Sequence, residues 1–123
     1  PHVVIFTESL NRVNVEDLGR RIRFHKQFAP RGANVNFVEV TGKNSLNVRT
    51  YERGVEAETL ACGSGTVASA IVGYLTDRIE APVEVKTRSG EVLHVYLDAR
   101  NQKVKNVFLE GSAEFVFEGR LLI

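Results

Sequence analysis

"GTVASAIVGYLTDR", residues 65–78, is the stretch that decides the fold. From Val67 to Leu75 it places apolar or small residues on nearly every side of a helix, and polar residues resume only at Thr76. A helix that is apolar almost all round has to be buried on most of its sides. The stretch therefore predicts a central helix that the rest of the chain encloses.

Most of the remaining sequence alternates as β-strands do. We predict strands at 2–6, 34–40, 45–54, 83–87, 91–97, 103–109 and 113–119, joined largely by hairpin turns. A second helix is predicted to begin at Val15 with Asn14 as its N-cap, and residues 55–61 are interpreted as a loop. A mainly antiparallel, barrel-like sheet wrapped around a central buried helix satisfies both patterns. The predicted fold class is α+β, with residues 1–123 as a single domain.

The composition of the chain bears on its binding partners and on its cellular location. The 123 residues are 43% hydrophobic and 25% charged, with a formal net charge of +1, which favours neither nucleic acid nor an anionic membrane. No run approaches the roughly 18 apolar residues of a membrane span. A single cysteine favours a reducing, cytoplasmic location, and the three histidines and Cys62 show no metal-ligand spacing.

The candidate chemistry centres on Cys62, which "CGSGT" (62–66) places at the N-terminus of the central helix. Free backbone N–H groups and the helix dipole favour negative charge there, and therefore favour a reactive thiolate. Gly63 and Gly65 leave room for a ligand carboxylate to approach those N–H groups. An inert, buried thiol and a redox-sensing thiol are the alternatives. Nearby, Glu52 and Arg53 taken alone indicate only a surface ion pair.

"TYERGVEAETLACGSGTVASA" (50–70) closely resembles the C-terminal active-site segment of the diaminopimelate epimerase family. "PHVVIF" (1–6) resembles the start of the family's second half, "FAPRGANVNFVEV" (28–40) its asparagine-bearing strand, and "GEVLHVYL" (90–97) its closing strands. The resemblance implies two pseudo-symmetric domains, each a barrel-like sheet around a helix. The chain would be the C-terminal catalytic half, with the N-terminal half absent.

The activity that the resemblance implies is interconversion of LL- and meso-diaminopimelate, in lysine and peptidoglycan biosynthesis of a bacterial or plant-type pathway. Two cysteines on opposite sides of one α-carbon exchange its proton, with no PLP, other cofactor or metal. The expected partners are diaminopimelate, the missing N-terminal domain and, through the face that this domain would cover, a second copy in a homodimer. Because the second cysteine is absent, the isolated chain is expected to be inactive.

The resemblance also implies roles for individual residues. Cys62 is one of the two cysteines, Glu52 orients it, and His2 supports the other cysteine. Glu52 and Arg53 also contact the substrate, and Asn34 holds the distal end of the substrate. The backbone N–H groups of Gly63 and Ser64 bind the carboxylate at the reacting carbon.

Two other functions remain open at this point. One is a related racemase of the same fold, such as a proline racemase, although the Glu-Arg pair followed by "ETLACGSG" (58–65) argues against it. The other is a non-catalytic binding or assembly domain in which Cys62 is inert.

Overall fold

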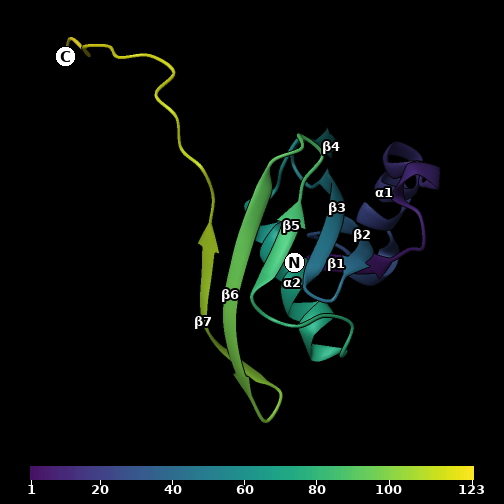
Figure 1. Ribbon diagram of the computed structural model, residues 1–123. Coiled ribbons are helices and arrows are strands. Elements are labelled where there is room, and N and C mark those ends of the chain that lie inside the picture. Colours follow the sequence, from purple (N-terminus) through teal and green to yellow (C-terminus); the bar gives the residue numbers. More distant parts are fainter.

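A curled sheet of seven strands forms the frame of the computed structural model, which describes residues 1–123. The strands follow the order β1-β2-β3-β5-β6-β7, and β4 pairs with β3 beside this path (Figure 1). The elements are β1 (His2–Phe6), α1 (Val15–Arg23), β2 (Asn34–Gly42), β3 (Ser45–Glu52), β4 (Ala57–Thr59), α2 (Gly63–Leu75), β5 (Val83–Lys86), β6 (Val92–Arg100) and β7 (Lys103–Glu110), with short 3-10 helices at Leu10–Arg12 and Lys26–Phe28.

The two helices lie on opposite faces of this sheet. Each helix connects a parallel pair of strands: α1 lies between β1 and β2, and α2 lies between β3 and β5. Both connections step across the sheet in the same direction, but β3 runs antiparallel to β2. Because such crossovers are right-handed, reversing the strand direction moves the second helix to the other face.

Each helix therefore covers its own hydrophobic core. On the α1 face, Val15 packs with Leu10, Val35, Phe37 and Tyr51. On the α2 face, the core contains Val38, Leu46, Val48, Ala70, Ile79, Val83, Val85, Val95 and Leu97. Strand β2 contributes to both cores, which explains why its centre is buried on both faces instead of alternating with solvent.

The predicted start of the first helix is confirmed. The Asn14 side chain accepts a hydrogen bond from the N–H of Asp17 at 3.2 Å, which satisfies one of the free donors of the first turn. Glu16 and Asp17 lie in that first turn, and arginines occupy the last, so the charges oppose the helix dipole.

The sheet confirms the predicted fold class and its mainly antiparallel character, with four antiparallel and two parallel pairings. Two details of the prediction are wrong. The segment interpreted as a loop contains β4, which pairs with β3. Residues 113–119 form no strand, and residues 111–123 are all exposed and extend away from the sheet (Figure 1). A strand needs a partner for its backbone groups, and this segment meets none in the chain.

Helix α2 is less enclosed than its sequence predicts. Its fully buried residues form one stripe of small side chains, Gly65, Thr66, Ser69, Ala70 and Gly73, while its other apolar residues are half-buried. The sheet curls around one side of α2 as a half-barrel and leaves the edges of β1 and β7 unpaired. With 13 residues, α2 is the longest helix, and no helix is long and apolar enough to cross a membrane.

Candidate active site

Cys62 is the N-cap residue of α2. Its backbone is extended (φ −136°, ψ 104°), and its carbonyl accepts the N–H of Thr66 at 2.9 Å. The helix thus begins at Gly63, one residue before the predicted start near Ser64 or Gly65. The thiol is half-buried, and its Sγ lies 3.7 Å from Ser64 Oγ. The first turn has no acidic residue, so no carboxylate competes for its free N–H groups.

The absence of a side chain at Gly65 lets the Asn36 side chain pack against the start of α2. A Cβ at this position would overlap Asn36 Oδ1 and would lie 3.2 Å from Cys62 Sγ. At Gly63, by contrast, the nearest group to a Cβ would be a Leu109 methyl carbon at 3.3 Å. Room for a ligand therefore explains Gly63 better than Gly65, where an asparagine side chain already fills the space.

Strand register brings His2, Asn34 and Glu52 to the face on which α2 begins. His2 pairs with Asn34 across β1 and β2. In the antiparallel strands β2 and β3, Val35 pairs with Tyr51; Asn34 precedes Val35 and Glu52 follows Tyr51, so Asn34 and Glu52 lie at the same end of the two strands. Because side chains alternate along a strand, all three point away from the α1 core and toward the α2 side. Three candidates that are distant in sequence therefore share one end of one face with Cys62.

Within the chain, these candidates contact one another through one side-chain hydrogen bond. Asn34 Oδ1 accepts the backbone N–H of Arg53 at 2.7 Å, while its Nδ2 makes no hydrogen bond within the chain. Glu52 forms neither an ion pair with Arg53 nor a hydrogen bond with Cys62. The Arg53 guanidinium donates instead to the carbonyl of Arg31 at 3.4 Å. The alternative of a simple Glu52–Arg53 ion pair is therefore wrong.

His2 lies at the start of β1 with its ring beside Asn36. Its Nδ1 is 3.3 Å from Asn36 Nδ2. Burial, and then the positive charges of the N-terminus and of Arg53, lower the pKa of His2 below its ordinary value of 6.5. The neutral imidazole is thus the favoured form.

Asn36 and Thr50 are site residues that the sequence analysis missed. Both are buried, and Thr50 Oγ1 donates to Asn36 Oδ1 at 2.8 Å directly below the start of α2. The available signal was the pattern "NVN" at 34–36, which places two asparagines on one face of a strand that is otherwise apolar.

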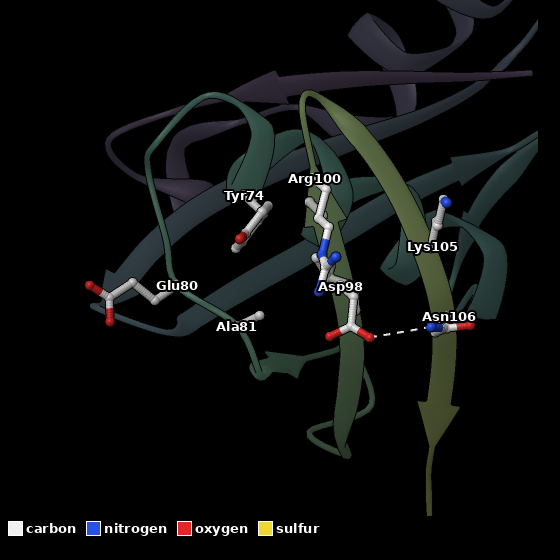
Figure 2. A pocket seen from close by; sticks show the side chains of 9 residues that line it. Tyr74, Glu80, Ala81, Asp98, Arg100, Lys105 and Asn106 are labelled. Atoms are coloured by element: carbon white, nitrogen blue, oxygen red, sulfur yellow. Dashed lines mark hydrogen bonds between the residues drawn. The ribbon is translucent and has the colours of Figure 1, made fainter.

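Of the candidate residues, only Cys62 lines one of the five best-formed crevices of the chain. The crevice that touches Cys62 has a volume of only about 10 Å³, between Thr50, residues 59–62, Thr66 and Arg88. The largest pocket, about 660 Å³, lies at the other end of α2 and contains no candidate residue. Figure 2 shows its lining, which includes Tyr74, Asp98 and Arg100, and Asn106 donates to Asp98 at 3.3 Å. No three His, Cys, Asp or Glu side chains gather in a metal-binding arrangement.

Comparison with known proteins identifies the family. A sequence model described as diaminopimelate epimerase matches residues 1–116. This chain belongs to the diaminopimelate epimerase family. The resemblance expected from residues 50–70 is thus confirmed across nearly the whole chain.

Two curated diaminopimelate epimerases illustrate the relationship. One from Aquifex aeolicus is 54% identical over 122 residues, which is 98% of this chain and 43% of the relative. One from Chlorobaculum tepidum is 40% identical over 124 residues, which is 100% of this chain and 47% of the relative. The chain therefore spans less than half the length of these diaminopimelate epimerases.

The fold is also found outside the diaminopimelate epimerases. A crystal structure of a Bacillus anthracis phenazine biosynthesis protein of the PhzF family matches with a TM-score of 0.60 and 17% identity. The match covers 89% of this chain and 33% of that protein. At this identity the likeness supports the half-barrel fold alone.

Proposed function

We propose that this chain is the C-terminal catalytic half of a diaminopimelate epimerase that interconverts LL- and meso-diaminopimelate. The observation that carries the proposal is the meeting of His2, Asn34 and Glu52 on the face where Cys62 begins α2, in a chain that matches the family over residues 1–116. The parent enzyme would serve lysine and peptidoglycan biosynthesis and would use neither PLP nor a metal.

Cys62 acts as the base on one side of the substrate α-carbon. Its thiolate takes the α-proton, the C–H electron pair stays on carbon as a carbanion, and a thiol of the missing half gives a proton to the opposite side. In the reverse direction the two sulfurs exchange roles. The N-cap position supports this role because the first free N–H groups of α2 stabilise negative charge at the thiolate.

The start of α2 also binds the carboxylate next to the reacting carbon. The N–H groups of Gly63 and Ser64 lie in the first turn, where they have no partner within the helix. Charge moves onto that carboxylate as the carbanion forms, so donors fixed in place stabilise the transition state more than the substrate.

The neighbouring strands hold the rest of the substrate. Arg53 binds a carboxylate, Glu52 contacts the substrate, and the free Nδ2 of Asn34 donates to the distal end. Because Glu52 makes no hydrogen bond with Cys62 in this chain, we expect it to orient Cys62 only in the complete, substrate-bound site. His2 faces the second cysteine, which the missing half would supply.

The missing half closes the site. Of the candidates only Cys62 touches a crevice, of about 10 Å³, and the chain covers 43% of its Aquifex aeolicus relative. A two-base reaction needs both sulfurs in one enclosed site, so we expect the isolated chain not to invert diaminopimelate. The N-terminal half, carried on the same polypeptide, is the partner that completes it.

The test is a substrate panel with the protein encoded by the complete gene. LL-diaminopimelate, meso-diaminopimelate, L-proline and D-proline are incubated separately, and stereochemistry is followed by chiral chromatography. We expect inversion of the two diaminopimelates and none of proline, with the 123-residue chain as an inactive control.

Two results would contradict the proposal. Inversion of proline without diaminopimelate would assign the protein to the racemase alternative. No inversion of any substrate, together with slow and pH-independent alkylation of Cys62 in the native protein, would indicate a binding or assembly domain.

A further inference from the structure

Asn36 is a buried carboxamide that lies between the two ends of the candidate site. It is 0% exposed and shares the α2 face of β2 with Asn34 and Val38. Burying an amide is unfavourable unless its donors and acceptor are hydrogen-bonded. Its partners therefore determine how it is oriented.

Those partners fix which atom of the amide faces His2. Asn36 Nδ2 donates to the carbonyl of Val3 at 3.0 Å, and Asn36 Oδ1 accepts from Thr50 Oγ1 at 2.8 Å. Since a backbone carbonyl only accepts, the NH₂ group has to point toward β1. Its second hydrogen then faces His2 Nδ1, which lies 3.3 Å from Nδ2.

A donor on Asn36 requires an acceptor on His2. In a neutral imidazole one nitrogen accepts and the other carries the proton, so an accepting Nδ1 leaves the proton on Nε2. Burial is the largest effect that disfavours the imidazolium of His2, and the positive charge of Arg53 acts in the same direction. No carboxylate forms an ion pair or hydrogen bond with the ring.

We propose that Asn36 is a positioning residue that holds His2 as the neutral Nε2–H tautomer. The consequence of this inference rests on the proposed function. In that case His2 presents a hydrogen-bond donor, not a base, to the second cysteine. Donation from Nε2–H stabilises the thiolate of that cysteine, while the only lone pair of the ring is engaged by Asn36.

The Asn36 side chain also lies between the start of α2 and the His2 ring. Asn36 Oδ1 lies against Gly65, where no Cβ could fit. One amide thus contacts the first turn of α2, which carries Cys62, and the ring of His2 on β1. A shift of Asn36 would move both.

The test is nuclear magnetic resonance of this chain, labelled with ¹⁵N at histidine. Long-range ¹H–¹⁵N correlations distinguish a protonated from an unprotonated Nδ1, and they report the tautomer without any enzyme assay. At neutral pH we expect His2 to show an unprotonated Nδ1 and a protonated Nε2. A protonated Nδ1, or the tautomer mixture of the unfolded chain, would overturn the proposal.

Two variants of Asn36 and one control test whether Asn36 determines the tautomer of His2. Asn36→Asp removes the donor and adds a carboxylate, so we expect Nδ1 to become protonated and the pKa of His2 to rise. Asn36→Ala is uncharged and should leave a mixture of both tautomers. Thr50→Val removes the neighbouring bond to Oδ1 but leaves Nδ2 in place, so its His2 spectrum should match the wild type.

An unchanged His2 spectrum in both Asn36 variants would contradict the assignment. If Asn36→Asp does not fold because it buries a charge, the wild-type and Asn36→Ala spectra still decide the question. Failure of the epimerase assay would refute the proposed function while leaving the tautomer result intact, so the two are tested separately.

Discussion

Gly65 is a residue of the candidate site at which packing leaves little freedom. Changing Gly65→Ala would drive a methyl group into Asn36 Oδ1, and this oxygen is held by Thr50. We expect a loss of about 1–3 kcal/mol of unfolding free energy, as is typical of overpacking. The measurement is urea unfolding followed by circular dichroism.

Gly73→Ala is the matched control, because it changes the same residue type in the same helix. Its Cβ would lie 3.0 Å from Ile79 Cδ1 and Cγ1 and 3.8 Å from Phe6 Cζ, so a shift of a few tenths of an ångström would accommodate it. Both variants gain the helix propensity of alanine, about 1 kcal/mol. Equal stability of the two variants would contradict a specific clash with Asn36.

The burial of His2 predicts a pH dependence of stability. Its pKa lies below 6.5 in the folded chain, chiefly because of burial, so the unfolded chain binds more protons just below pH 6.5. Stability should therefore fall as the pH is lowered through this window and recover as it is raised. His2→Gln should flatten this part of the profile, measured as urea midpoints between about pH 5 and pH 7.5. If the stability of the variant depended on pH in the same way as that of the wild type, His2 would be excluded as the source of the pH dependence.

At the scale of elements, an ion pair fastens α1 to the turn after Glu52 and Arg53. Arg23 Nε and Nη2 donate to the Glu56 carboxylate at 3.0 and 2.9 Å, and Arg23 Nη1 donates to the Arg31 carbonyl at 3.2 Å. The Arg23 side chain is only 11% exposed. Glu56 has a positive φ of 59°, which is unfavourable for a side chain of its size, so this pair holds the turn in place.

We expect Arg23→Gln to lower the unfolding free energy by about 2–3 kcal/mol, because it leaves a partly buried carboxylate without its bidentate partner. Arg21→Gln is the control, since Arg21 pairs with Asp17 at 3.7 Å on the surface, with 72% and 65% of the side chains exposed. Its expected effect is below about 0.5 kcal/mol. Chemical denaturation of both variants measures the difference, and similar losses would show that the buried pair is not special.

The sequence predicts the elements far better than it predicts their pairing. Local signals identify the caps, strands and turns, including Asn14 and the strand that begins at Asn34. The parallel pairings of β1 with β2 and of β3 with β5 depend on which face each helix covers, and no local signal carries that information. Strand β4 is missed because "AET" (57–59) has little strand propensity and forms only by pairing with β3.

The site shows the same division between local and tertiary information. Cys62 at a helix N-terminus follows from the sequence, because glycines and an apolar helix are local features. The contribution of Asn36 could not be predicted, since it depends on the β1–β2 register and on the approach of α2 to within contact of β2. Buried polar residues on apolar strands are the places where sequence reasoning should expect such functions.

For the molecule as a whole, the C-terminal tail and the outer strand carry exposed apolar side chains. They include Phe108, Leu109, Phe115, Val116, Phe117, Leu121, Leu122 and Ile123. Apolar surface of this extent favours association in water. We expect the chain to self-associate as its concentration rises, measured by sedimentation velocity.

Deleting residues 113–123 should reduce that association and change the unfolding free energy by less than about 0.5 kcal/mol, because the tail packs on nothing. The double substitution Phe115→Ser with Phe117→Ser is a full-length control that should act in the same direction. A wild-type chain that stays monomeric at high concentration would contradict this expectation.

The central claim is that Cys62 is one of two bases acting on opposite sides of one α-carbon. The most direct measurement uses the complete gene product in D₂O and follows α-hydrogen exchange and inversion separately for LL- and meso-diaminopimelate. In Cys62→Ala we predict that inversion falls by about 10²–10⁴-fold, while slow exchange without inversion persists for only one of the two stereoisomers. Inversion that continues at a rate close to that of the unmodified protein would contradict the account.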